Sequence, residues 1–275
     1  MSFLGFSTIF FLLMALTLSG CNNDPEPDPV SQTSKSDNDA SKKETATVSK
    51  PVVGKDSLTQ CFNPSLYTGA NIYVHKAEVR SSLDEKYTQR LEIRFGADTE
   101  WNSKAMKTST AEFRKSTDEF TTISSGYRDY YQVDSKNYRI KKFAVEGILG
   151  NVTMETTYSP FEVIPYYLEA GESITLRHVT KSPAGMREVS REWNFHGIEE
   201  VTVPKGTFQA CKVTHRDYES GDELSIKSTT WIAVGSGIDL KNIVSKPMKE
   251  LGARYEMVAV LESATLNGAE ISINP

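Results

Sequence analysis

Apolar and polar side chains alternate along much of the chain after residue 57. The clearest case is residues 87–95, where Leu91, Ile93 and Phe95 are separated by charged residues. A period of two is typical of a β-strand with one face in a core and one in water. The same alternation recurs at residues 174–176, 193–195 and 255–261. One-sided strands of this kind predict an antiparallel sheet.

These segments are short, rich in Tyr, Val, Ile and Thr, and divided by Gly, Asp and Asn. The predicted fold is mainly β, a curved antiparallel sheet, half-barrel or sandwich with at most one or two short helices. A helix is expected where Ser159 and Pro160 precede an apolar run that Gly171 would end. Five strands are predicted most clearly, at residues 71–80, 87–95, 119–124, 127–134 and 138–146.

The start of the chain has a different pattern. Residues 3–18 are almost entirely apolar and are followed by small residues, as in a secretory signal peptide at residues 1–20. A transmembrane helix is the alternative, but it needs an apolar run of about 18–20 residues. Leu18-Ser19-Gly20-Cys21 resembles the lipobox of bacterial lipoproteins. The resemblance implies that Cys21 carries a lipid and becomes the mature N-terminus.

The next segment, residues 21–56, is mostly Asn, Asp, Pro, Ser, Thr and Lys, without an aromatic side chain. Such a composition cannot bury enough apolar surface to fold, so we expect a disordered tether. Residues 57–275 then form a single β-rich domain. Asn22 follows the lipidated position where an Asp would favour the inner membrane in enterobacteria. The resemblance therefore implies an outer-membrane anchor facing the periplasm.

The net charge limits which partners the protein can bind, and the cysteine content limits which covalent links it can form. The net charge is −5 and both signs are mixed along the chain, so nucleic acid is not expected to bind. The expected partners are the membrane, through Cys21, and an apolar ligand or an envelope protein. Of the three cysteines, Cys61 and Cys211 remain for a disulfide in an oxidising compartment, with two buried free thiols as the alternative.

Chemical motifs are sparse. We find no zinc, calcium, nucleotide or nucleophile-elbow motif, so no metal, cofactor or catalytic residue is assigned. His215 and Asp217 would share one face of a strand, which fits an acid–base or metal pair and equally a solvated polar face. Tyr127, Tyr130 and Tyr131 would suit a sugar or lipid site, but strand aromatics more often pack in a core.

Residues 200–213, which read EVTVPKGTFQACKV, predict two strands joined by a turn at Pro204 and Gly206. The segment resembles a sequence motif of uncharacterised periplasmic β-rich proteins and lipoproteins, and residues 168–173 and 230–237 extend the match. This resemblance implies a curved sheet broadly similar to the half-barrels of Lol-type lipoprotein carriers, which hold acyl chains on their concave face.

The expected function is therefore that of an outer-membrane-anchored lipoprotein, non-enzymatic, that binds an apolar ligand or an envelope partner. A hydrolase of envelope polymers and a purely structural envelope protein are the alternatives. A carrier would need a concave apolar face with few polar groups, whereas an enzyme would need convergent titratable groups in one pocket.

Overall fold

The computed structural model describes residues 56–81, 86–116, 125–219, 223–248, 253–266 and 269–270. The predicted signal peptide, Cys21, almost all of the tether and the strand expected at residues 119–124 lie outside the described residues. Twelve strands follow one another around a closed wall, each paired with its neighbour in the sequence, and β1 pairs with β12 to close it. In the part of the chain that the structure describes, a thirteenth strand, β13, pairs with β12.

The mainly antiparallel β fold is confirmed, and the sheet closes completely, beyond the half-barrel that was expected. The strands are β1 (Ile72–Ser81), β2 (Lys86–Trp101), β3 (Lys104–Ser116), β4 (Ser125–Asp134), β5 (Arg139–Leu149), β6 (Val152–Pro165), β7 (Ser173–Ser182), β8 (Gly185–Val203), β9 (Gly206–Glu219), β10 (Glu223–Ala233), β11 (Asp239–Met248), β12 (Ala253–Leu266) and β13 (Ala269–Glu270).

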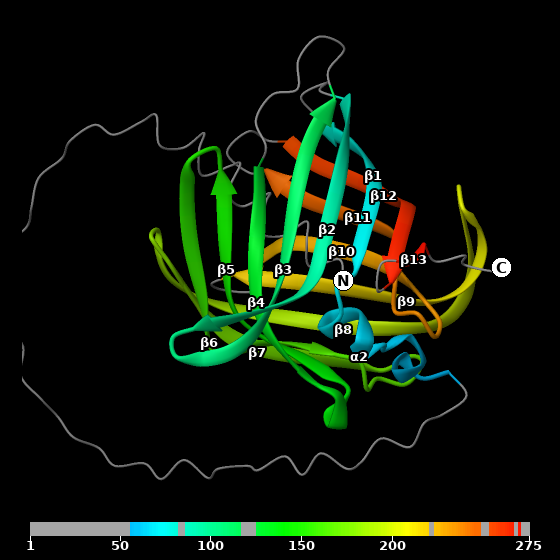
Figure 1. The fold of residues 1–275 in the computed structure, drawn as a ribbon, viewed down its shortest axis with the longest axis horizontal. Helices are drawn as coiled ribbons and strands as arrows, with labels where there is room; N and C mark the ends of the chain where they lie inside the picture. Colours follow the sequence, from blue (N-terminus) through cyan, green and yellow to red (C-terminus); the bar gives the residue numbers. More distant parts are fainter. Residues whose placement is uncertain are drawn as a thin grey trace, which may run out of the picture.

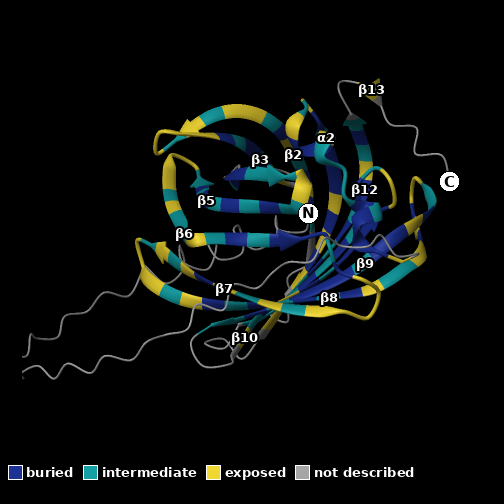
Figure 2. Cartoon of the chain, turned by 90° about the horizontal axis from the view of Figure 1, so that it is seen from below, coloured by how far each residue is buried: buried dark blue, intermediate teal, exposed yellow. Residues whose placement is uncertain are grey.

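The wall changes direction between β6 and β7. In Figure 1, β3 to β6 run upright, whereas β7 to β9 cross below them at a steep angle. Along most strands inward residues are buried and outward ones are exposed, as the colouring of Figure 2 shows. The interior is therefore a core lined by both groups of strands.

The expected helix after Ser159 is not formed, because β6 runs through Pro165. Glu162 and Ile164 are buried while Phe161 and Val163 are half-exposed, so the segment alternates with a period of two. The helix prediction failed because it grouped Phe161, Val163 and Ile164 on one helical face, whereas they lie on both faces of a strand. Glu162 was not expected to point inward.

The short helices lie instead in a segment that we call the plug, residues 57–71. It contains the 3-10 turn η1 (Leu58–Cys61) and α2 (Pro64–Thr68). Ser57 and Asn63 cap the two helices with their side-chain oxygens. Among the described residues a further 3-10 turn, η2 (Ser135–Asn137), joins β4 to β5.

The plug crosses one end of the barrel. Leu58, Leu66 and Tyr67 are buried in the main core, and the Tyr67 ring contacts Phe95 of β2 edge to face. On the opposite side, the Gly235 amide between β10 and β11 donates to the Gln60 carbonyl at 2.8 Å. Burying large apolar side chains contributes about 1.5–3 kcal/mol each, which favours this docked position.

The predicted hairpin at residues 200–213 is present. Val203 of β8 pairs with Gly206 of β9, and the ladder continues through Val201 and Phe208 into the core. Cys211 follows on β9 with its side chain fully buried.

Candidate functional site

The candidate site lies where the barrel wall is interrupted. The ladder between β6 and β7 holds three residue pairs, from Thr157↔Lys181 to Ser159↔Val179. Beyond Ser159, β6 continues with Pro160, which has no backbone N–H to offer a ladder. We call residues 160–165 of β6 and 173–178 of β7, which are not paired with each other, the seam.

Apolar side chains of β7 line the seam on the inside. Ile174 and Leu176 are partners of Trp193 and Arg191 in the β7–β8 ladder, so they share the inward face with these buried residues. Both pack against the main core, yet both are only partly buried. Part of each of these two residues is therefore accessible to solvent.

A buried ion network includes Glu162 of the seam. Arg191 of β8 donates to both carboxylate oxygens of Asp217 on β9, with Nε–Oδ1 at 2.5 Å and Nη2–Oδ2 at 2.6 Å. Its Nη1 also forms an ion pair with Glu162 of β6. These side chains are each at least 93% buried. Bidentate charge-assisted bonds of this kind are among the strongest in proteins.

A second ion pair continues the network along the wall. Lys142 of β5 lies 2.7 Å from Asp129 of β4, and both side chains are buried. Burial raises the pKa of Asp129, while the Lys142 ammonium opposes that shift. Burial alone would lower the pKa of Lys142, but attraction by Asp129 raises it above its ordinary value. The attraction between Asp129 and Lys142 therefore offsets the desolvation cost of burying the two charges.

The histidines near the network are neutral at pH 7. Burial lowers the pKa of His178 to about 4, although Asp217 acts in the opposite direction. Burial also lowers the pKa of His215 well below its ordinary value, and Arg191 adds to the effect. The His178 ring meets Tyr158 of β6 edge to face at 5.4 Å, on the side of the seam where the ladder begins.

His215 and Asp217 do share a face of β9, and that face points inward. Asp217 directs both oxygens to Arg191, and the His215 ring lies against Trp193 with centroids 4.7 Å apart. Neither arrangement orients the imidazole as a base for a nucleophile. Among the described residues, no group of three or more His, Cys, Asp or Glu side chains is placed to hold a metal ion.

The three neighbouring tyrosines do not form one cluster. Tyr127 and Tyr131 lie in the main core, and the Tyr131 hydroxyl donates to the Tyr67 carbonyl of the plug at 2.9 Å. Tyr130 lies outside that core and faces Trp101 at 6.1 Å. The structure therefore places two of these rings in barrel packing.

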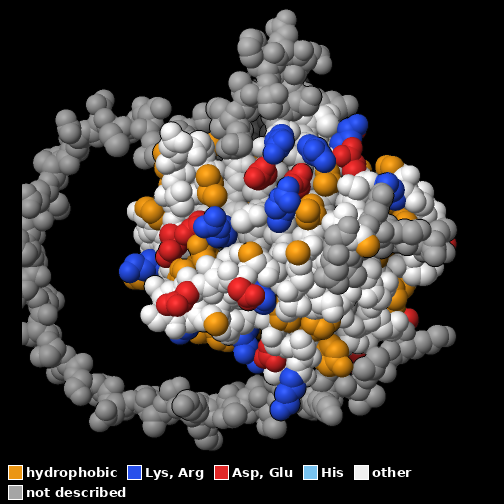
Figure 3. All heavy atoms as spheres, in the orientation of Figure 1, with side chains coloured by type: hydrophobic (Ala, Val, Ile, Leu, Met, Phe, Trp, Pro, Cys, Tyr) orange, Lys and Arg blue, Asp and Glu red, His pale blue; other side chains and the backbone are white. Residues whose placement is uncertain are grey.

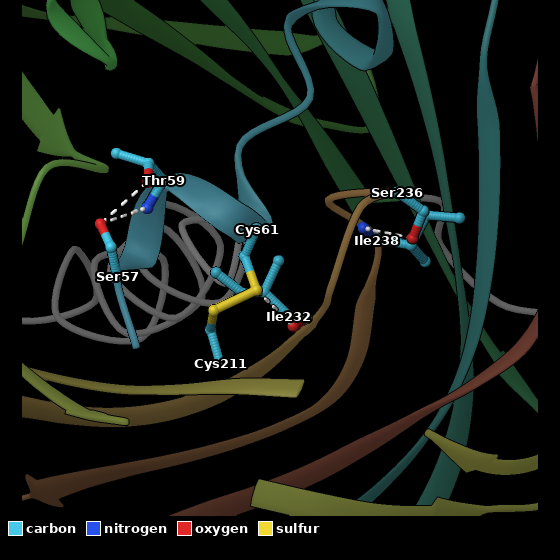
Figure 4. Close-up of a disulfide and its surroundings, with 7 residues drawn as sticks. All are labelled: Ser57, Thr59, Cys61, Cys211, Ile232, Ser236 and Ile238. Carbon is cyan, nitrogen blue, oxygen red and sulfur yellow. Dashed lines mark hydrogen bonds between the residues drawn. A yellow bond between two sulfur atoms is a disulfide. The ribbon is translucent and has the colours of Figure 1, made fainter. Parts of the chain in front are cut away.

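Cys61 of the plug and Cys211 of β9 are joined by a disulfide, with Cα atoms 6.3 Å apart (Figure 4). This separation lies within the range that a disulfide can span. The bond ties the start of the domain to the second strand of the predicted hairpin. It lies on the barrel's interior side, where both residues are 0–1% exposed.

Sequence reasoning missed the charged members of the site: Asp129, Lys142, Glu162 and Arg191. A signal was present in two of them. Asp129 stands between Tyr127 and Tyr131, and Arg191 stands two residues before Trp193, so each occupies an inward position of an alternating strand. Such a charge is a candidate for a buried ion pair, but its partner on another strand cannot be read from the pattern.

The outer surface is of mixed character. On the face shown in Figure 3, acidic and basic side chains lie close together and hydrophobic ones are scattered among them. In the described part of the chain, no helix is both long and apolar enough to cross a bilayer.

Comparisons with known proteins give fold-level likeness only. No protein-family model matches the chain, and no curated protein matches it. A β-barrel-like protein of a domain of unknown function from Brucella abortus matches with TM-score 0.44 and 9% identity, over 73% of this chain and 98% of that one. A protein from Bacteroides fragilis, described as exported with a YmcC-like fold, matches with TM-score 0.38 and 14% identity, over 72% and 97%. A protein from Parabacteroides distasonis, described as a lipoprotein, matches with TM-score 0.40 and 12% identity, over 72% and 96%.

Proposed function

We propose that this protein is a non-enzymatic envelope lipoprotein, anchored through Cys21 in the outer membrane and facing the periplasm, whose barrel binds an apolar ligand at the seam. The anchor rests on the lipobox and on the signal-like apolar run before it. The binding role rests on the structure of the barrel at the seam.

One observation carries the binding role. The ladder between β6 and β7 ends with the pair Ser159↔Val179, and the inward-facing Ile174 and Leu176 beyond that pair are only partly buried. Apolar side chains that water can reach next to a core gain free energy when an apolar chain covers them, at about 25 cal/mol per Å². An acyl chain lying along β7 would provide that cover.

The neighbouring charges favour binding over hydrolysis. A hydrolase needs a carboxylate or imidazole that is free to move a proton in a substrate pocket. Here Asp217 is engaged by Arg191 and Asp129 by Lys142, so these groups hold the wall together. A purely structural or partner-binding role is the outcome that remains if no apolar ligand binds.

A fluorescent fatty acid tests the binding role. In the mature chain with Cys21→Ser, which carries no acyl chain of its own, we expect saturable uptake. Leu176→Asp should weaken that binding at least about tenfold, because it places a charge on the apolar seam. Val179→Asp is the matched control, since Val179 lies on the same strand with its side chain 37% exposed.

Two results would contradict the proposal. One is uptake no greater than that of an unrelated protein, and the other is equal weakening by the two aspartate substitutions. The anchor has its own test, because Cys21→Ser should abolish incorporation of labelled palmitate. Equal labelling of that variant would overturn the lipidation of Cys21.

A further inference from the structure

The barrel wall lacks its usual backbone support along the seam. Among the described residues, the ladder of three pairs between β6 and β7 compares with six pairs in the next shortest ladder of the wall, between β10 and β11. The strand directions also diverge at this point, as Figure 1 shows. Residues 162–165 are paired with β5 on one side, so on the β7 side something other than backbone hydrogen bonds must hold this part of β6.

The Arg191 side chain supplies that connection. Arg191 stands opposite Leu176 in the β7–β8 ladder, and its guanidinium extends beyond β7 to reach Glu162 on β6. The same guanidinium is fixed from the other side by the bidentate contact with Asp217 on β9. Asp217, Arg191 and Glu162 therefore link β9 to β6 past the part of β7 that is not paired with β6.

The Glu162 carboxylate forms an ion pair with Arg191. In the β5–β6 ladder its partner position is Lys142, whose ammonium is paired with Asp129 at 2.7 Å. If Glu162 leaves Arg191, Lys142 is therefore a neighbouring cation that can receive it. Because a buried charge without a partner is costly, a second partner close by makes separation of β6 from Arg191 feasible.

We propose that the Glu162–Arg191–Asp217 bridge is the latch of a lateral gate, and that parting Glu162 from Arg191 opens the seam between β6 and β7 to the apolar ligand. This inference rests on the proposed binding role. In the latched state Ile174 and Leu176 are only partly accessible and the core behind them is closed, whereas the open state exposes that core.

The latch is tested without any ligand by amide hydrogen exchange in the full mature chain. In Glu162→Gln the ion pair is lost while the side-chain shape is kept. We expect amides within residues 161–164 and 173–178 to exchange at least about tenfold faster than in the unaltered chain, while those of β1, β2 and β9 stay unchanged. Glu155→Gln, on the exposed part of the same strand, is the control and should leave the seam unchanged.

A purely structural role for the bridge gives a different pattern. In that case exchange rises equally in all strands, or the seam changes no more than in the control, and either result overturns the latch. If Glu162→Gln does not fold, Glu162→Asp retains the charge on a shorter side chain. It should give the same selective increase at smaller size, and an unselective or absent increase again counts against the latch.

Ligand kinetics separate the latch from the binding role. With a fluorescent fatty acid, Glu162→Gln should raise the association and dissociation rates together, by at least about fivefold, and change Kd by less than about threefold. Unchanged rates would contradict the gate even where the probe binds. Absence of binding in the unaltered chain would instead refute the proposed function, while the exchange pattern would still report on the latch.

Discussion

At the scale of single residues, the partners of a side chain decide its chemistry. Asp217 and His215 lie on one face of β9, as the sequence indicated, but Arg191 takes both oxygens of Asp217. The pattern of one strand gives the direction of a side chain. It cannot give the residue that arrives from β6 or β8, and this is why the ion network could not be predicted.

His178 makes stability depend on pH. Its pKa is lowered to about 4 in the folded protein, against about 6.5 when unfolded. Between these values the unfolded chain binds a proton that the folded chain does not, so the free energy of unfolding falls as the pH drops from 6.5 towards 4. The contribution of His178 reaches about 3 kcal/mol at most.

Urea unfolding of the unaltered chain and of His178→Phe across this pH range measures the effect. The two profiles should differ in slope between pH 6.5 and 4, with the variant flatter. Parallel profiles would show that His178 titrates alike in both states. His75 and His215 contribute in the same direction in both chains, because burial lowers their pKa as well.

The disulfide is a second property of individual residues. Cys61 and Cys211 are separated by 150 positions, so the bond closes a long loop in the unfolded chain. Replacing both by Ala should lower the free energy of unfolding by about 2–5 kcal/mol in urea melts. In the chain with Cys21→Ser, the denatured and unreduced protein should contain no titratable thiol. Two thiols would contradict the bond.

At the scale of elements, alternation predicted strands well where the inward residues are large and apolar. β3 was missed because its inward positions include small or polar residues such as Ser109 and Ala111. Its hairpin turn uses Asn102 and Ser103, both with positive φ, in place of the Asn-Gly pair that marks such turns in a sequence. β6 was misread because Glu162 faces inward.

Docking of the plug onto β2 depends on a glycine. Gly96 has φ +83°, and a Cβ there would lie 2.0 Å from the carbonyl oxygen of Gly69. Gly96→Ala should therefore push the plug away from the barrel. We expect it to lower the free energy of unfolding by at least about 2 kcal/mol more than Gly150→Ala does.

Gly150 is the matched control because its φ is +57° and nothing lies within 4 Å of the added Cβ. Its replacement should cost only the conformational penalty of about 1–2 kcal/mol. Equal losses in the two variants, measured by urea unfolding, would mean that the contact between Gly69 and Gly96 does not position the plug.

At the scale of the molecule, closure was the feature that the sequence left undecided. A curved sheet becomes a barrel only if its first and last strands meet, and the pairing of β1 with β12 depends on the twist accumulated over all strands between them. The plug then covers one end of the barrel. Among the described strands, the ladder between β6 and β7 ends after three residue pairs.

A crystal structure with a bromine-labelled fatty acid tests whether an apolar ligand enters the barrel at the seam, because the anomalous signal of bromine locates the acyl chain without assumptions about the protein. With bromine near the end of the acyl chain, we expect one strong anomalous peak inside the barrel wall, next to Ile174 and Leu176. A peak on the outer surface, or none at saturating ligand, would contradict the claim that the seam leads an apolar ligand into the barrel.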